Sequence, residues 1–124
     1  MADAVDGSEV LVVDDDRDIR EVLAEVLQDE GYSVALAVNG ADALRYLRSG
    51  GSPRVILLDL MMPIMDGWRF RSEQLQDPAL GRIPVIVLTA DGGAKEKAAT
   101  LKATEGITKP VRLDALLSAV ARVC

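Results

Sequence analysis

Short apolar runs alternate with segments of helical period along the whole chain. Residues 10–13 and 55–58 are apolar throughout, and residues 33–38 and 84–88 are nearly so. A fifth and weaker run lies near residues 106–108. Continuous apolar runs of this length are typical of strands that are buried on both faces of a parallel sheet. We therefore predict five buried strands.

The segments between these runs have the spacing of amphipathic helices. The first segment repeats apolar residues at intervals of three and four and is followed by a glycine that stops the helix: Ile19, Val22, Leu23, Val26, Leu27 and then Gly31. Further helices are predicted over residues 41–47, 67–76, 94–101 and 111–123. Five strands alternating with five helices predict an α/β fold, with a parallel sheet covered on both faces.

Length and composition limit what such a fold can do. The 124 residues suffice for one domain, with a core over about 9–123 and a flexible tail at 1–7. The net charge of −6 argues against direct nucleic-acid binding. The single cysteine, Cys124, excludes an internal disulfide. The N-terminus lacks the features of a signal peptide, and the apolar runs are too short to span a membrane, so we expect a cytoplasmic protein.

Polar side chains follow the predicted strands at the points where the strands end. Asp14, Asp15 and Asp16 follow the first strand, and the third, fourth and fifth strands are followed by Asp59, Thr89 and Lys109. Ligands of open parallel sheets bind outside the carboxyl ends of the strands, where the strand order reverses. Taken alone, Asp16 is best explained as the cap of the next helix. Taken together, these residues predict a site at one edge of the sheet.

Three carboxylates at one edge need a compensating positive charge. Two carboxylates about 4 Å apart repel by roughly 4 kcal/mol at an effective dielectric constant near 20. Lys109 supplies one positive charge, and a divalent cation would supply the rest. Because the site offers carboxylate oxygens with no histidine or cysteine nearby, Mg²⁺ is favoured over zinc. Mg²⁺ held by few carboxylates keeps positions open for phosphate oxygens, so the pattern points to phosphoryl chemistry.

Four segments of the chain resemble the receiver domain of two-component response regulators. They are Val-Leu-Val-Val-Asp-Asp-Asp at 10–16, Val-Ile-Leu-Leu-Asp-Leu-Met-Met-Pro at 55–63 with Met-Asp-Gly at 65–67, Pro-Val-Ile-Val-Leu-Thr-Ala at 84–90 and Thr-Lys-Pro-Val at 108–111. The resemblance covers residues 9–123. It implies a flavodoxin-like three-layer (βα)5 sandwich with a five-stranded parallel sheet in the order 2-1-3-4-5.

The resemblance also assigns roles to the strand-end residues. It implies that Asp59 is the phosphorylated aspartate and that Asp59, Asp15 and the backbone carbonyl of Met61 are Mg²⁺ ligands. Asp14 would act on the metal mainly through water. Thr89 would hydrogen-bond one phosphoryl oxygen and Lys109 would pair with another. The peptide bond between Lys109 and Pro110 is expected to be cis.

Two further positions bear on the lifetime and the readout of the phosphorylated state. By the resemblance, Met61 and Asp91 flank the path of the hydrolytic water, with Met61 shielding the site and Asp91 ordering or repelling water. Gly106 stands where typical receivers carry an aromatic residue that turns inward together with Thr89. Its presence is either a tolerated variant or a sign that output bypasses an aromatic switch. A glycine should also weaken the fifth strand and make the preceding helix mobile.

The expected function is that of a signalling protein which catalyses only its own phosphorylation and dephosphorylation. The phosphoryl donor would be a sensor histidine kinase or a histidine phosphotransfer protein. It would dock beside Ile19, Arg20 and Leu23 and on the loop after Lys109, although Ile19 or Leu23 could equally be a core residue. Phosphorylation would control binding to a downstream protein partner, and we expect a monomer or a weak homodimer.

Three other functions share features with this one. A phosphatase of the haloacid-dehalogenase type also forms an aspartyl phosphate, and Asp14 with Asp16 could mimic its acidic pair. However, the second acidic pair of that family is absent, and there is no room for a cap domain. A degenerate receiver could serve as a docking module that does not depend on phosphorylation. A flavin-binding protein shares the layering, but no Ser/Thr-rich phosphate loop follows the first strand.

Overall fold

The computed structural model describes residues 8–124, so the tail predicted for residues 1–7 lies outside the described residues. Five strands alternate with five helices, as predicted. The strands are β1 (Glu9–Val13), β2 (Ser33–Ala37), β3 (Val55–Asp59), β4 (Val85–Thr89) and β5 (Glu105–Thr108). The helices are α1 (Arg17–Asp29), α2 (Gly40–Arg48), α3 (Gly67–Gln76), α4 (Ala94–Thr100) and α5 (Leu113–Val123).

The strands form one parallel sheet in the order β2-β1-β3-β4-β5, which confirms the predicted order. From β1 the chain first moves outward to β2 and then returns past β1 to β3. The strand order therefore reverses between β1 and β3. Because α/β sheets bind their ligands at such a reversal, the carboxyl ends of β1 and β3 are where a site is expected.

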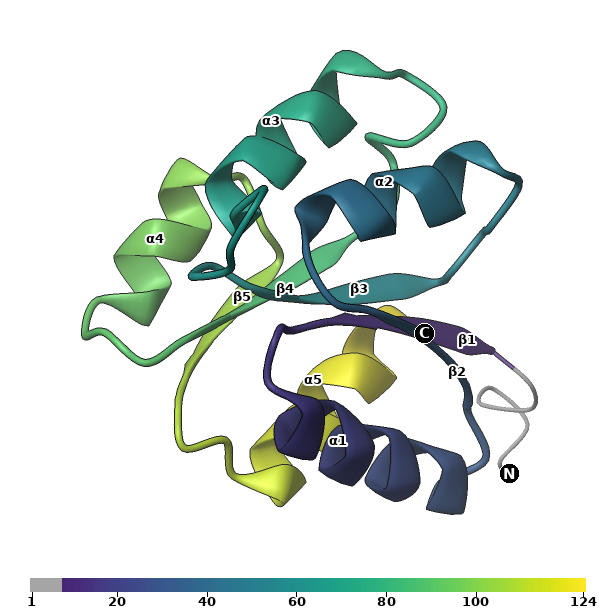
Figure 1. Ribbon diagram of the computed structural model, residues 1–124. Helices are drawn as coiled ribbons and strands as arrows, with labels where there is room; N and C mark the ends of the chain where they lie inside the picture. The colour runs from purple at the N-terminus through teal and green to yellow at the C-terminus, as the bar shows by residue number, and fades with distance from the viewer. Residues whose placement is uncertain (1–7) are drawn as a thin grey trace.

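Helices cover both faces of the sheet and complete three layers (Figure 1). Helices α2, α3 and α4 lie on one face, and α1 and α5 lie on the other. Alternate residues of each central strand supply the two cores, so that Leu11 and Val13 pack on the α2–α3 side and Val10 and Val12 on the α1–α5 side. This alternation explains why the central strands are apolar at every position.

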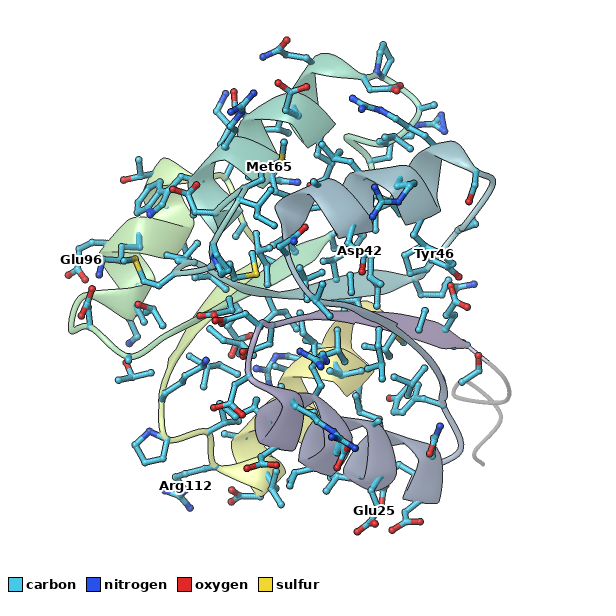
Figure 2. The ribbon with its side chains drawn as sticks, viewed as in Figure 1. Glu25, Asp42, Tyr46, Met65, Glu96 and Arg112 are labelled. Atoms are coloured by element: carbon cyan, nitrogen blue, oxygen red, sulfur yellow. The ribbon has the colours of Figure 1, made fainter. Side chains whose placement is uncertain are left out.

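The labelled side chains of Figure 2 mark the two outer layers. Tyr46 and Met65 lie on the α2–α3 side of the sheet, while Glu25 and Arg112 lie on the α1–α5 side. Gly40, at the start of α2, allows α2 to lie close to the segment that leads into α3. The N–H of Gly40 donates to the carbonyl of Met65 at 2.9 Å, and a Cβ added at Gly40 would lie 2.8 Å from the Met65 side chain.

None of the helices formed by residues 8–124 has both the length and the apolar character needed to cross a membrane.

Side-chain caps set the starts of three helices. The carboxylate of Asp16 accepts hydrogen bonds from the N–H groups of Asp18 and Ile19, and Asn39 and Asp66 cap α2 and α3 in the same way. Each cap satisfies N–H groups that have no partner inside the helix. The predicted capping role of Asp16 is confirmed.

The details that differ from the sequence predictions include the starts of β4 and α5 and the exposure of Val22. Strand β4 begins at Val85 and not at residue 84, since Pro84 has no N–H to donate to the ladder. Helix α5 begins at Leu113 and not at residue 111, because the backbone of Arg112 is extended and Val111 packs against the core on the α1–α5 side of the sheet. Val22 was predicted to lie on the buried face of α1 but is 52% exposed.

Candidate functional site

The register of the sheet brings Asp14 and Asp59 to neighbouring positions. Val13 pairs with Leu58 of β3 and with Ala37 of β2, so the next residue of each central strand, Asp14 and Asp59, stands at the same edge. The ladder continues one step further on the β2 side, where the N–H of Asp14 donates to the carbonyl of Ala37 at 3.1 Å. Both aspartates are buried, which is unusual for carboxylates and requires compensating contacts.

Asp15 completes a cluster of three carboxylates. One oxygen from each of Asp14, Asp15 and Asp59 can be chosen such that all three lie within 4.8 Å of one another. Asp15 itself is exposed to solvent. Asp16 is not part of this cluster, since its carboxylate caps α1. The side chain of Asp14 also accepts a hydrogen bond from the N–H of Asp16 at 2.9 Å, which fixes the loop between β1 and α1.

Lys109 reaches the cluster from the end of β5. Its Nζ donates to Oδ2 of Asp14 at 2.8 Å and lies 3.4 Å from Oδ1 of Asp59. Burial of the ammonium group acts to lower the pKa of Lys109, but the hydrogen bond and the charge of Asp14, together with Asp59, outweigh it and raise this pKa. Lys109 therefore remains charged at neutral pH. The predicted cis peptide bond between Lys109 and Pro110 is confirmed.

Thr89 ends β4 next to this cluster and is buried. Its hydroxyl oxygen accepts a hydrogen bond from the N–H of Asp91 at 3.2 Å, and its carbonyl accepts one from the N–H of Lys109 at 2.8 Å. The hydroxyl proton of Thr89 is thus left for another acceptor. The Asp91 side chain is 70% exposed and lies 3.6 Å from Nζ of Lys97, so its carboxylate is held toward α4.

The environment of Asp59 disfavours its charge. Burial raises the pKa of the Asp59 carboxyl to about 6, and the nearby charge of Asp14 adds to this effect. Lys109 and a hydrogen bond from the backbone N–H of Met61 act in the opposite direction but do not cancel it. The cluster is therefore short of positive charge when only the protein is considered, which is the situation that a bound cation relieves.

The donor set fits a hard divalent cation. All side-chain donors of the cluster are carboxylate oxygens, with no histidine or thiol among them. Oxygen donors of this kind suit Mg²⁺ and exclude the nitrogen and sulfur coordination typical of zinc. Asp15 is exposed while Asp14 and Asp59 are buried, so a cation here would sit at the protein surface with room for further oxygen ligands.

Gly106 lies against the first turn of α4. A Cβ added at Gly106 would stand 2.2 Å from the carbonyl oxygen of Ala94 and 3.1 Å from the Cβ of Ala98. No side chain fits there unless the helix shifts. The weak strand expected around Gly106 is nevertheless formed, because Gly106 pairs with Val87 of β4 within a continuous ladder. Glycine at this position thus permits close packing of α4 on β5.

An apolar groove of about 260 Å³ opens beside the site. Helix α1 supplies Ile19, Val22 and Leu23, and the segment after Lys109 supplies Pro110 and Val111. Leu23 is buried in the core on the α1–α5 side of the sheet, whereas Ile19 is partly exposed. Of the two residues that could have been core, Leu23 is therefore the core residue and Ile19 lines the groove. The exposed position of Val22 is explained by this groove, which it lines.

The structural roles of three residues were not predicted. The guanidinium of Arg20 donates to the carbonyl oxygen of Asp14 at 2.8 Å and so ties α1 to the loop that carries the acidic pair. Arg71 and Gln74 are buried in α3 and bond to backbone carbonyls of other segments. Backbone acceptors leave no mark in a sequence, so spacing could not have revealed these partners. The only sequence feature that could have indicated burial of Arg71 is its position directly after the core residue Phe70.

Comparison with known proteins places the chain in a family. Residues 10–121 match the family model of the response regulator receiver domain. Response regulator MprA of Mycobacterium sp. (strain KMS) is 40% identical over 111 residues, which cover 88% of this chain and 47% of MprA. MprA of Mycobacterium avium (strain 104) matches with the same identity and coverage. The chain thus spans about half the length of these curated relatives.

Solved structures give the same result. CheY4, a chemotaxis protein of Vibrio cholerae, has a TM-score of 0.86 and 31% identity, covering 95% of this chain and 99% of CheY4. The receiver domain of a histidine kinase from Syntrophus aciditrophicus has a TM-score of 0.84 and 34% identity, covering 94% and 89%. TrrA of Thermotoga maritima, in complex with Mg²⁺ and BeF, has a TM-score of 0.83 and 32% identity, covering 94% and 99%.

The family match covers nearly the whole described chain and includes every strand-end residue of the acidic site. The fold, the strand order and the sequence relatives agree with it. The chain therefore belongs to the response regulator receiver domains of two-component signalling.

Proposed function

We propose that the chain relays a signal by accepting a phosphoryl group on Asp59 from the phosphohistidine of a sensor histidine kinase or a histidine phosphotransfer protein. The observation that carries this proposal is the environment of Asp59. Its carboxylate stands at the carboxyl edge of the sheet, 3.4 Å from the ammonium of Lys109 and beside two further carboxylates. A structural aspartate would not be expected to share such an edge with like charges.

The proposed transfer exchanges one bond to phosphorus for another. A carboxylate oxygen of Asp59 forms a bond to phosphorus while the bond from phosphorus to the donor's imidazole nitrogen breaks. The nitrogen keeps the electron pair and takes up a proton from water. Because the transition state of phosphoryl transfer is loose, the receiver contributes mainly position and charge neutralisation. Dephosphorylation is a separate hydrolysis in which water attacks phosphorus, the bond to Asp59 breaks with its electron pair left on the carboxylate, and inorganic phosphate leaves while a proton passes to solvent.

Asp14, Asp15, Asp59 and the backbone carbonyl of Met61 are the groups that we propose to hold Mg²⁺, with Asp14 acting mainly through water. The oxygen cluster supports this assignment, and so does the presence of Mg²⁺ in the related TrrA structure. When bound, Mg²⁺ would neutralise the negative charge that gathers on the phosphoryl oxygens. The two buried carboxylates and the exposed Asp15 would orient it beside Asp59.

Thr89 and Lys109 are proposed to bind the oxygens of the transferred group. Lys109 already contacts Asp59, so a small rotation of its side chain would bring Nζ to a phosphoryl oxygen. Thr89 can donate its hydroxyl proton because its oxygen is already engaged by the N–H of Asp91. Met61, which is 65% exposed, would shield the acyl phosphate, and Asp91 would order or repel the hydrolytic water.

The apolar groove beside the site is the proposed docking surface for the phosphoryl donor. It is lined by Ile19 and Val22 of α1 and by Pro110 after Lys109, next to the residues that receive the phosphoryl group. An apolar helix of the donor seated there would bring its phosphohistidine to Asp59. A polar substitution such as Val22→Asp should weaken phosphotransfer from a kinase while leaving phosphorylation by a small phosphodonor intact.

The geometry disfavours the phosphatase alternative. That alternative uses Asp14 together with Asp16, but Asp16 caps α1 and its oxygen bonds to the N–H groups of Asp18 and Ile19. Asp14 is fully buried and hydrogen-bonded to Lys109, so its oxygens are less available for attack than those of Asp59. We therefore propose Asp59 and not Asp14 as the nucleophile.

Incubation with acetyl phosphate tests the proposal. Intact mass spectrometry should show one added phosphoryl group per chain when Mg²⁺ is present and none when Mg²⁺ is removed by a chelator. Asp59→Asn should abolish the modification. Asp29→Asn, an exposed aspartate at the end of α1, is the matched control and should be modified like the unaltered chain. Full modification of Asp59→Asn would refute the assignment.

The degenerate-receiver alternative needs a separate test. If output depends on phosphorylation, Asp59→Asn should abolish the phosphorylation-dependent change in binding to the downstream partner. Unaltered binding and output in Asp59→Asn, with normal folding by circular dichroism, would favour a docking module that works without phosphorylation.

A further inference from the structure

Arg71 is a buried cation that the phosphoryl chemistry does not use. It is 5% exposed, and among residues 8–124 no carboxylate forms an ion pair with it. Its Nε donates to the carbonyl oxygen of Leu101 at 2.9 Å, and its Nη2 donates to that of Lys102 at 2.8 Å. Its Nη1 donates to Oε1 of Gln74 at 2.8 Å. Burying a charge in this way is costly unless its hydrogen bonds are made.

Gln74 extends the network to a third segment. Its side chain is fully buried one turn after Arg71, and its Nε2 donates to the carbonyls of Leu80 at 2.9 Å and Ile83 at 3.2 Å. Among residues 8–124, every buried side-chain nitrogen and oxygen has a hydrogen-bond partner. The two side chains therefore connect α3 to the α3–β4 loop and to the end of α4 in one satisfied network.

The carbonyls bound by Arg71 are those at the C-terminal end of α4. Leu101 is the C-cap of this helix, and Lys102 follows it with φ of 55°, the left-handed conformation that commonly ends helices. A guanidinium at this position compensates the partial negative charge of the helix end. Helix α4 has only seven residues, so it depends on such tertiary contacts for its stability.

The other end of α4 is held by close packing. The carbonyl of Ala94 lies where a Cβ of Gly106 would stand, so the first turn sits directly on β5. Figure 2 shows Glu96 on the side of α4 that is turned away from α3. The buried side of α4 carries Ala94 and Ala98. The helix is thus fixed at its start by the contact with Gly106 and at its end by Arg71.

We propose that Arg71 and Gln74 form a latch which keeps α4 in one position against α3, so that phosphorylation of Asp59 is not transmitted by a displacement of α4. This inference rests on the proposed function of Asp59. It replaces the expectation that Gly106 makes the preceding helix mobile. In a receiver with this latch, the phosphorylated state is recognised at the edge that carries Asp59 and its neighbouring loops.

Hydrogen exchange of the whole chain, followed by mass spectrometry, tests the latch. In the unaltered protein, amides of residues 94–104 should exchange at the same rate, within about twofold, before and after treatment with acetyl phosphate and Mg²⁺. The phosphorylated fraction is measured by intact mass in the same samples. Arg71→Met should speed exchange of these amides by about tenfold or more, because three hydrogen bonds of a charged group are lost.

The acceleration in Arg71→Met should be greater in α4 than in the core strands β1 and β3, which distinguishes loss of a latch from general destabilisation. Arg69→Met, an exposed arginine on the same helix, is the matched control and should leave exchange unchanged. If Arg71→Met fails to fold, Arg71→Lys and Gln74→Met, which remove only part of the network, should give smaller accelerations in the same amides.

Two results would overturn the latch. One is an unchanged exchange rate of residues 94–104 in all the Arg71 and Gln74 variants. The other is a change of about tenfold or more in the unaltered protein on phosphorylation. If intact mass shows no phosphorylation at all, the proposed function fails, while the comparison of unmodified variants still decides whether Arg71 and Gln74 hold α4.

Discussion

Lys109 makes its shortest ionic contact with Asp14 and not with the proposed phosphoryl acceptor. Its Nζ lies 2.8 Å from Oδ2 of Asp14 and 3.4 Å from Oδ1 of Asp59. Asp14 is fully buried, so water cannot solvate its negative charge and the ion pair with Lys109 compensates it instead. Asp59 is left with incomplete compensation, and its raised pKa reflects that shortage. The arrangement leaves Asp59 as the carboxylate best placed to gain from new positive charge.

Removal of the ammonium should damage both the fold and the chemistry. We expect Lys109→Met to lower the free energy of unfolding by about 2–4 kcal/mol at pH 7, because a buried carboxylate loses its partner. We also expect phosphorylation by acetyl phosphate to slow by about a hundredfold or more, since a charge that stabilises the transferring group is absent. Urea denaturation and the rate of mass increase measure the two effects.

Lys95→Met is the control for Lys109→Met, because Lys95 is an exposed lysine on α4. It should change the free energy of unfolding by no more than about 0.5 kcal/mol. Equal stability and equal phosphorylation rates in the two variants would show that the contact between Lys109 and Asp14 has no role.

Any side chain at Gly106 should destabilise the fold. A Cβ at this position would lie 2.2 Å from the carbonyl oxygen of Ala94, which is far inside van der Waals contact. Gly106→Ala should therefore cost about 1–3 kcal/mol of stability in urea denaturation, and Gly106→Tyr should cost more. Gly92→Ala is the control, since no heavy atom lies within 4 Å of its added Cβ. A neutral Gly106→Ala would mean that α4 moves aside without cost.

Ile64 holds a strained conformation in the loop between β3 and α3. Its φ is 70° and its side chain is 83% exposed, so little packing offsets the steric cost of a β-branched residue in the left-handed region. Ile64→Asn should raise the free energy of unfolding by about 0.5–1 kcal/mol, because asparagine adopts this conformation readily. Leu75→Asn, at an exposed helical position, should give no gain. Thermal or urea denaturation would show whether only Ile64→Asn stabilises.

Tyr46 should titrate at unusually high pH. Its hydroxyl donates to the carboxylate of Glu9, and this hydrogen bond, with burial and the charge of Glu9, raises the pKa of Tyr46 to about 12. The folded-state pKa exceeds the ordinary value of 10, so the stabilisation is present below pH 10 and is lost as the pH rises toward 12. Ultraviolet titration of tyrosinate should show this, and Glu9→Gln should move the midpoint down toward 10. An unchanged midpoint in Glu9→Gln would contradict the assigned cause.

The sequence was sufficient to predict the sheet and the acidic site because both follow from one-dimensional rules. Apolar runs mark strands that are buried on two faces, and parallel strands bring the residues after them to one edge. That reasoning placed Asp14, Asp59 and Lys109 together, and the register and the ion pairs confirm it. The cap at Asp16 followed equally from local chemistry.

The parts that escaped prediction depend on three-dimensional contacts with the backbone. Arg71 binds carbonyls some thirty positions further along the chain, and any residue could have supplied them. The close approach of Ala94 to Gly106 could not be predicted either, because it depends on how α4 packs on β5. Val22 fits the helical spacing of apolar residues in α1 but lies at the edge of the buried face of this helix, so it lines the groove and is not part of the core.

The central claim is that Asp59 carries the phosphoryl group. The most direct measurement is reduction with borohydride after treatment with acetyl phosphate and Mg²⁺, followed by peptide mapping, because reduction converts an aspartyl phosphate into homoserine. We predict homoserine at position 59 and aspartate at positions 14, 15 and 16. Homoserine at position 14, or its absence from position 59 in protein that has gained the mass of a phosphoryl group, would contradict the claim.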